Sequence, residues 1–175
     1  MRRINRSARL LALTASTFLA VSTGITGASA SPRASDLDSL GTSEGNETES
    51  SGLIAEVNQV ETNESGNILS VTWSIENQGS ERVVLTWLYG RTYTYSGANF
   101  SGVTVASNEG ASRHHPVMDG MGECLCSGNN SSSFKERLEA GDKVSYWSMF
   151  SVPGDVESVT IEIPGFEPIE DVPIS

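Results

Sequence analysis

A regular alternation of apolar and polar residues in the middle of the chain constrains its fold more than any other feature. Between residues 67 and 77, large apolar side chains occupy every second position: Leu69, Val71, Trp73 and Ile75. Successive side chains of a β-strand point to opposite faces, so this pattern predicts a half-buried strand. The same period recurs in residues 82–89, after a turn at residues 77–80, and predicts the second strand of a hairpin.

Further short segments that favour strands follow, separated by Gly, Asn, Asp and Pro. We predict strands at residues 53–62, 92–95, 102–107, 143–150 and 158–163. Seven short strands within residues 52–175 are typical of an antiparallel β-sandwich, so we expect one all-β domain there. A short helix is the alternative for residues 133–140, but the turn-forming residues 138–142 favour a strand or loop.

Three tryptophans are expected to help to form the core of this domain. Trp73, Trp87 and Trp147 stand at positions predicted to point inward on three different strands. A buried tryptophan removes on the order of 200 Å² from water, so we expect at least two of them in the core.

The first thirty residues have the features of a secretory signal peptide. Four arginines precede an apolar run at residues 10–21, and Ala28-Ser29-Ala30 offers a cleavage site. As a helix the run would be about 18 Å long, less than the roughly 30 Å of a hydrocarbon core, so it is too short for an anchor. We predict cleavage after Ala30 and an exported, soluble mature protein without a transmembrane segment.

Residues 31–51 differ in composition from the rest of the mature chain. Leu37 and Leu40 are their only large apolar residues, and acidic residues outnumber basic ones. Such a segment buries too little apolar surface to offset its ordering entropy, so we predict a disordered acidic linker between the signal peptide and the domain at residues 52–175.

The charge balance excludes some classes of partner. The chain has 11 Lys and Arg against 22 Asp and Glu, a net charge of −11. Four of the arginines belong to the predicted signal peptide, which leaves a mature protein of charge −15. A surface this acidic repels phosphate backbones, so we expect no nucleic-acid partner and no anionic membrane partner. A cell-wall or protein partner remains open.

No catalytic motif stands out in the sequence. It contains no Gly-x-Ser-x-Gly, no His-Glu-x-x-His and no phosphate-binding Gly-rich loop, and its two histidines are adjacent. We therefore expect no enzymatic activity.

One segment collects the side chains that soft metals prefer. Both histidines, both cysteines and two of the four methionines lie within thirteen residues: His114, His115, Met118, Met121, Cys124 and Cys126. Imidazole, thioether and thiolate ligands suit Cu(I), so a copper site is one hypothesis for this segment.

A disulfide between Cys124 and Cys126 is the competing interpretation, and we favour it. Exported proteins usually pair their cysteines, and pairing removes the thiolates that a metal would need. In an extended strand the two Cα atoms would be about 6.6 Å apart, near the upper limit for a bridge, so a slight bend would close it. A redox-active pair is a further alternative.

Aromatic residues between positions 89 and 100 form a second candidate site. The candidates are Tyr89, Tyr93, Tyr95 and Phe100. If this segment is a strand, Tyr93 and Tyr95 project from one face and could stack on sugar rings, which indicates carbohydrate or cell-wall binding. The simpler interpretation, which we favour, is that these aromatics cover an edge of the sandwich.

Two stretches of the sequence resemble a known group of domains. VTWSIENQGSERVVLTW, followed later by LEAGDKVSYWSMFSVP, resembles the exported immunoglobulin-like sandwich domains of Gram-positive bacteria. In those domains a strand ends in Asn-x-Gly, and a later strand follows Leu-x-x-Gly-Asp or Leu-x-x-Gly-Glu. GECLCS and the closing IEIPGFEPIEDVPIS resemble uncharacterised secreted proteins of actinobacteria. The resemblance implies an immunoglobulin-like fold and an extracellular location, and no activity.

Exported copper(I) chaperones with similar sandwiches use Met and His as ligands. Here His115 and Met118 supply one His-x-x-Met, and the second His/Met group of such chaperones is missing. The sequence therefore predicts a secreted, non-enzymatic binding or surface-associated module of unknown ligand. Copper binding and carbohydrate binding are the alternatives.

Overall fold

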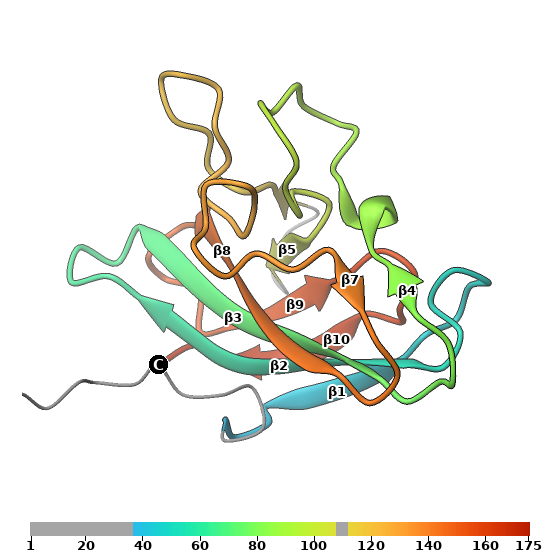
Figure 1. Ribbon diagram of the computed structural model, residues 1–175. Coiled ribbons are helices and arrows are strands. Elements are labelled where there is room, and N and C mark those ends of the chain that lie inside the picture. Colours follow the sequence, from blue (N-terminus) through green and yellow to red (C-terminus); the bar gives the residue numbers. More distant parts are fainter. Residues whose placement is uncertain (1–36, 108–111) are drawn as a thin grey trace, which may run out of the picture. The chain divides into compact units, whose positions relative to one another are not determined.

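The computed structural model, which describes residues 37–107 and 112–175, is built from antiparallel β-strands and contains no α-helix in these residues (Figure 1). The strands are β1 (Gly41–Glu44), β2 (Leu53–Thr62), β3 (Ile68–Asn77), β4 (Val83–Val84), β5 (Thr104–Ser107), β6 (Arg113–His114), β7 (Arg137–Leu138), β8 (Lys143–Ser151), β9 (Ser158–Glu162) and β10 (Ile169–Pro173). A single 3-10 turn, η2 (Thr86–Leu88), lies between β4 and β5. The all-β prediction is confirmed, whereas the predicted signal peptide, residues 1–30, lies outside the described residues.

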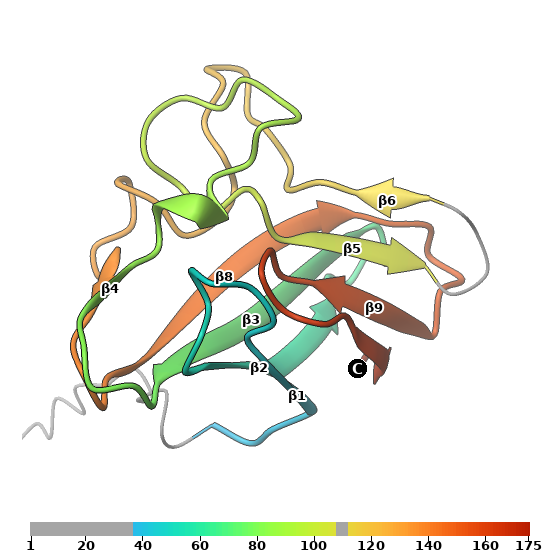
Figure 2. The same cartoon turned by 90° about the vertical axis from the view of Figure 1, so that its right-hand side faces the viewer.

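Two four-stranded antiparallel sheets lie on either side of a shared core, as in a β-sandwich (Figures 1 and 2). The strand order is β1-β2-β3-β8 in one sheet and β10-β9-β5-β6 in the other, and β4 and β7 form a small separate pair. Side chains of both large sheets belong to one buried cluster, which includes Leu69, Trp73, Val105, Phe150, Val159 and Ile161. No helix in the part of the chain described is long and apolar enough to cross a membrane.

Strand β3 carries the centre of the core, as its alternation predicts. Leu69, Val71, Trp73 and Ile75 are all fully buried. The Trp73 ring packs against Tyr146, with ring centroids 4.8 Å apart, and against Phe100 at 6.1 Å.

The other two tryptophans are less buried than predicted. Trp87 is half-buried and packs against the core from η2. Trp147 lies on the opposite face of β8, since Tyr146, Ser148 and Phe150 take the inward positions of that strand. The prediction is wrong for Trp147 because β8 has large apolar residues on both faces, which leaves the phase of the alternation ambiguous.

Most of the long predicted strands are confirmed, but the predicted hairpin between residues 67–77 and 82–89 is wrong. Strand β3 pairs with β2 on one edge and with β8 on the other, and these pairings occupy both of its edges. Residues 82–89 therefore form only the two-residue strand β4, which pairs with β7, and the turn η2. Residues 92–95, also predicted as a strand, form a loop.

The predicted disordered linker is corrected at its C-terminal end. Strand β1 pairs with β2, and the loop after it joins the other sheet, where the Asn46 backbone N–H donates to the Gly165 carbonyl at 2.9 Å. Ser50 is fully buried, and its hydroxyl donates to the same carbonyl at 2.5 Å. This segment is ordered through backbone pairing rather than apolar burial, which its composition does not reveal.

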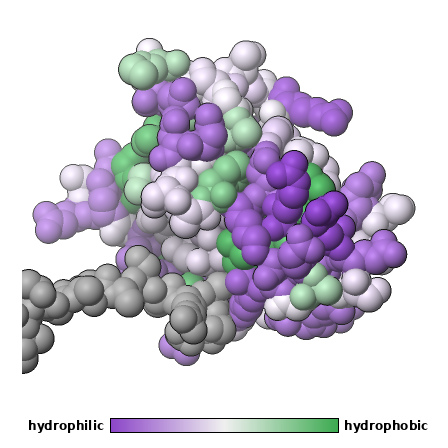
Figure 3. All heavy atoms as spheres, viewed as in Figure 1, coloured by the Kyte–Doolittle hydropathy of each residue, from purple (hydrophilic) through white to green (hydrophobic). Residues whose placement is uncertain are grey.

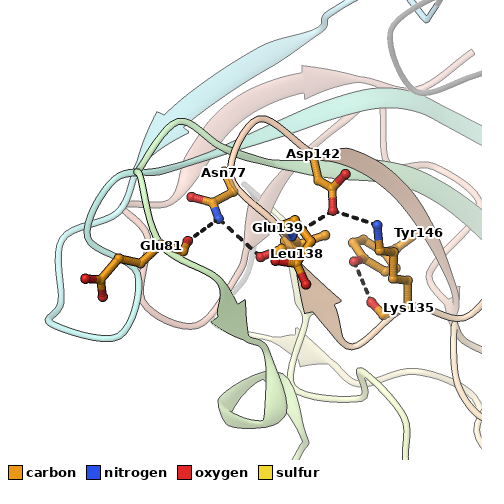
Figure 4. A network of polar contacts seen from close by, with 7 residues as sticks. All are labelled: Asn77, Glu81, Lys135, Leu138, Glu139, Asp142 and Tyr146. Carbon is orange, nitrogen blue, oxygen red and sulfur yellow. Dashed lines mark hydrogen bonds and ion pairs between the residues drawn. The ribbon is translucent and has the colours of Figure 1, made fainter.

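The favoured non-helical interpretation of residues 133–140 is confirmed by β7 and the turn that follows it. Figure 4 shows Asn77 at the end of β3, where its Nδ2 donates to the carbonyls of Glu81 at 2.8 Å and Leu138 at 3.2 Å. Nearby, Asp142 Oδ2 accepts from Lys135 Nζ at 2.6 Å. The Asn77 contacts tie β7 and the segment before β4 to the end of β3, and the Lys135–Asp142 pair joins the segments that precede β7 and β8.

Candidate functional site

Two segments that the sequence presents as separate candidate sites meet at one surface hollow. This tyrosine hollow has a volume of about 350 Å³, and its walls include Tyr93, Tyr95, His114, His115, Val117 and Met118. The segments lie side by side beyond one end of the sheets, where isolated bridges join Ser96 to Glu123 and Asn99 to Gly128 (Figures 1 and 2). A ligand in this hollow would contact both segments.

Tyr93 is the exposed aromatic ring of the tyrosine hollow. Its side chain is 52% exposed, and its ring lies edge-to-face with His115, at a centroid distance of 4.9 Å, and with Tyr95, at 6.1 Å. Tyr95 is half-buried, and its hydroxyl donates to the Pro116 carbonyl at 2.6 Å. Burial, with a smaller effect of Tyr93, raises the pKa of Tyr95. The two tyrosines thus form a corner instead of the flat platform that a strand would give.

The other two aromatic candidates lie elsewhere. Phe100 is fully buried among Trp73, Phe134 and Tyr146 in the core, so its assignment as a ligand-binding residue is corrected. Tyr89 is half-buried against Phe100 and lines a neighbouring hollow. A buried core needs large aromatics as a binding surface does, and residue type alone does not distinguish the two roles.

Cys124 and Cys126 form a disulfide, with their Cα atoms 5.2 Å apart. The chain bends enough to bring the two residues closer than in an ideal strand, as the favoured interpretation requires. The six-residue metal set therefore loses both thiolates. Among the described residues no group of three or more His, Cys, Asp and Glu side chains is placed to hold a metal ion. Met121 is 80% exposed at a loop tip and lies outside the tyrosine hollow.

The loop that carries Met118 is anchored to strand β8. The Val117 N–H donates to the Met149 carbonyl at 2.8 Å, and the Met149 N–H donates to the Leu125 carbonyl at 2.9 Å. At the loop tip, Asp119 Oδ1 accepts from the backbone N–H groups of Met121 and Glu123. These bonds hold the wall of the tyrosine hollow in place.

A second hollow, of about 460 Å³, adjoins the first one. We call it the arginine hollow, and its walls include Trp87, Tyr89, Arg91, Arg113, His115 and Glu162. Arg113 and His115 line both hollows. Sequence patterns do not predict this site, because its residues come from distant segments and no local pattern joins them.

An ion pair lies in the wall of the arginine hollow, and its arginine also lines the tyrosine hollow. Arg113 binds Glu162 through two contacts of 2.7 Å each, from Nε and from Nη2, and the Thr104 hydroxyl donates to the same carboxylate at 2.7 Å. Burial and the Arg113 charge lower the pKa of His115, and Glu162 opposes them more weakly. The lowered pKa favours the neutral form of the His115 imidazole.

No protein-family model matches the sequence, and no curated protein matches it. Among solved structures, the chain is similar to a functionally unknown protein from Listeria monocytogenes EGD-e. The two share 15% sequence identity at a TM-score of 0.41, and the match covers 78% of this chain and 85% of that chain. A likeness at this level carries no argument about function.

Proposed function

We propose that this protein is a secreted, non-enzymatic binding module and that it binds a carbohydrate in the tyrosine hollow. The observation that carries the proposal is the meeting of Tyr93 with the 113–118 segment around one hollow of about 350 Å³. Ligand sites are concave, have volumes of this order and combine aromatic walls with a few polar groups. Tyr93 offers an exposed aromatic ring, and the neighbouring His115 offers hydrogen-bonding nitrogens.

The strand order supports an immunoglobulin-like sandwich within this proposal. Such domains place strands A, B, E and D in one sheet and strands C, F and G in the other, and the described strands can be matched to all of these except D. If β2, β3, β5, β8, β9 and β10 are taken as A, B, C, E, F and G, the two sheets have the orders A-B-E and G-F-C. Strand β6 then extends the second sheet next to C, and β1 extends the first sheet next to A.

The sequence and the disulfide support an extracellular location. The first thirty residues have the pattern of a signal peptide, and disulfides persist mainly in oxidising compartments. The resemblance to secreted proteins of actinobacteria agrees with both. We propose that the partner is a cell-wall glycan, because an exported protein meets such glycans outside the cell.

Glycan binding can be tested with the exported protein and a Tyr93→Ala variant. Both are applied to an array of bacterial surface glycans, and affinities for any hit are measured by calorimetry. We expect the wild type to bind and Tyr93→Ala to bind at least about tenfold more weakly, a loss of about 1.4 kcal/mol from stacking and burial of the ring. Met121→Ala is the matched control, because Met121 is exposed but lies outside the hollow. Equal binding by wild type and Tyr93→Ala, or no bound glycan, would contradict the proposal.

Copper(I) binding is a second candidate, and one observation favours it: His115 and Met118 both line the tyrosine hollow. With the disulfide closed, these two side chains and His114 are the soft-ligand candidates there. Native mass spectrometry of the oxidised protein, with one equivalent of Cu(I) under anaerobic conditions, tests this. Copper retained by the wild type and lost in His115→Ala/Met118→Ala would support the candidate, and a metal-free wild type would end it.

A further inference from the structure

We infer that the glycan is anionic and that its negative group binds in the arginine hollow. This inference rests on the proposed function, because it extends the carbohydrate of the tyrosine hollow into its neighbour. The shared chemistry is a carboxylate or phosphodiester carried by a sugar polymer. Four observations lead to it. The hollow has basic walls, its Glu162 carboxylate is already hydrogen-bonded, aromatic side chains line it, and it shares two residues with the tyrosine hollow.

The walls of the arginine hollow are basic in a protein that is otherwise acidic. The chain has twice as many acidic as basic residues. Two of the six Lys and Arg residues of segments 37–107 and 112–175 nevertheless line this one hollow, and Glu162 is the single carboxylate there. A local positive site within a negative surface selects an anion that the rest of the surface repels.

The one carboxylate of the hollow is already fully engaged. Both Glu162 oxygens accept hydrogen bonds, from Arg113 and from the Thr104 hydroxyl. Arg113 uses two of its five N–H donors in this pair, which leaves three for a ligand. The Arg91 side chain is exposed and has no ion pair or hydrogen bond with any described residue. Within residues 37–107 and 112–175, the hollow therefore presents one guanidinium without a partner and three unused N–H donors of another, and guanidinium groups bind carboxylates and phosphates well.

Aromatic side chains provide the surface for the rest of a sugar ring. Trp87 and Tyr89 line the arginine hollow, and Trp87 packs against Phe166 with ring centroids 6.0 Å apart. These half-buried aromatic walls suit the flat, apolar face of a sugar ring.

The shared boundary of the hollows lets one polymer occupy both of them. Arg113 and His115 line the two sites, so sugar units on either side of this pair belong to neighbouring positions. A chain that places one ring against Tyr93 can place a charged unit against Arg91 and Arg113.

The test compares acidic polysaccharides with neutral versions of the same backbones. The probes are polygalacturonate, alginate and hyaluronan, the carboxyl-reduced form of each, and wall teichoic acid as the phosphodiester source. The proteins are the wild type, Arg91→Ala and Arg82→Ala. Arg82 is exposed and lies outside both hollows, so its removal changes net charge by the same amount. Affinities are measured by calorimetry at two salt concentrations.

We expect the wild type to bind at least one anionic polymer about tenfold more tightly than its neutral form, with weaker binding at higher salt. Arg91→Ala should lose about tenfold for that polymer, and Arg82→Ala should bind as the wild type does. Binding of a uronate or of teichoic acid alone identifies the source of the charge. Equal binding of acidic and neutral forms, or equal losses in the two arginine variants, would overturn the inference.

Tyr93→Ala separates failure of this inference from failure of the proposed function. If Tyr93→Ala loses binding but Arg91→Ala retains full affinity, the tyrosine hollow binds glycan and the arginine hollow has no part in it. If Tyr93→Ala binds every probe as well as the wild type, the proposed function fails, and the inference that rests on it fails with it.

Discussion

Asn77 shows how one side chain fixes several segments at once. The Asn-x-Gly sequence predicts a turn after β3, and the structure explains it, since Asn77 Oδ1 accepts from the Gly79 N–H at 3.0 Å. The contact of this amide with the Glu81 carbonyl is also local, whereas the contact with the Leu138 carbonyl joins positions 61 residues apart. A local motif therefore predicts the turn, whereas the role in joining β7 to β3 depends on tertiary structure.

We predict that Asn77→Ala destabilises the protein by about 2–4 kcal/mol. Asn77 is 1% exposed, so its loss leaves two carbonyls and one backbone N–H without their partner, and each buried unsatisfied group costs about 1–3 kcal/mol. Urea unfolding measures the change. Asn67→Ala, at an exposed residue of the preceding turn, should stay within about 0.5 kcal/mol of the wild type. Similar losses in both variants would show that the Asn77 amide has no special role.

A second residue-scale feature is the nearly buried ion pair of Glu56 and Lys143, which joins β2 to β8 across the strand β3 that lies between them. Lys143 Nζ donates to Glu56 Oε2, and the Ser74 hydroxyl of the intervening strand also reaches this carboxylate. Burial, the largest single influence, acts to raise the pKa of Glu56. The hydrogen bonds from Lys143, Ser39 and Asn58, with the Lys143 charge, outweigh it, and the pKa of Glu56 lies below its ordinary value of 4.5.

This lowered pKa predicts how stability changes with pH. The folded state holds Glu56 ionised, so its contribution is complete above pH 4.5 and is lost as pH falls through the folded-state pKa. Glu56→Gln should cost about 1–3 kcal/mol at pH 7 and flatten the stability curve below pH 4.5. Urea titrations between pH 3 and 7 measure both. Glu64→Gln, at an exposed turn residue, is the control and should keep the wild-type slope.

At the scale of elements, the loop after β1 has an ordered structure that the sequence does not predict. Gly45 approaches the backbone of Ser50 so closely that a Cβ at position 45 would lie 1.9 Å from the Ser50 carbonyl oxygen. That carbonyl accepts the Leu53 N–H at the start of β2. Close backbone approach is thus part of how β1 joins the first sheet.

We predict that Gly45→Ala destabilises the fold by about 3 kcal/mol, because the Ser50 carbonyl must move to admit the methyl group. Gly120→Ala is the matched control, since a Cβ there meets nothing within 4 Å. Thermal unfolding of both variants gives the comparison. If Gly45→Ala unfolds at the same temperature as the wild type, residues 41–51 contribute no stability and act as the linker that their composition predicts.

The disulfide of the 117–126 loop should contribute little to global stability. It closes a loop of only three residues, for which the chain-entropy estimate is about 1–2 kcal/mol. We expect Cys124→Ser/Cys126→Ser to unfold at slightly lower urea concentration, with a midpoint that no longer responds to reductant. A loss above about 4 kcal/mol would show that the bridge supports the core as well as the loop.

Sequence patterns predict these elements to very different degrees. The long strands β2, β3, β8 and β9 are predictable because each combines alternation with β-favouring residues. The two-residue strands β6 and β7 and the polar strand β1 are not, because they are too short or too polar to show an alternation and are defined by their pairing with β5, β4 and β2. The candidate site is also predictable only in part. Tyr93 and His115 can be chosen from the sequence by their residue type. The Arg113–Glu162 pair cannot, because it joins positions 49 residues apart.

At the scale of the whole molecule, the acidic composition and the predicted signal peptide both agree with the proposed extracellular location. Figure 3 shows one face of the molecule, on which hydrophobic residues form separate small patches between hydrophilic ones. Such a surface favours solubility, and it leaves recognition to local sites such as the two hollows.

We predict that the exported protein begins at Ser31 and carries a closed disulfide. Intact mass spectrometry of protein recovered from the medium of a secreting host measures both, because closure removes two hydrogens that reduction restores. An arginine-free n-region, made by changing Arg2, Arg3, Arg6 and Arg9, should reduce export. Recovery of uncleaved chain outside the cell would contradict the predicted cleavage site.

The outer edge of strand β8 affects how the protein behaves at high concentration. Along residues 147–150, the edge of β8 away from β3 is covered by the loop that carries the disulfide, through bonds to Trp147 and Met149. The outermost strands that remain are short or irregular: β1 has four residues, β6 has two, and β10 is interrupted at Asp171, which has a φ of 54°. Open strand edges are templates on which other chains assemble into aggregates. The cover over β8 therefore protects the protein against sheet-edge self-association at high concentration.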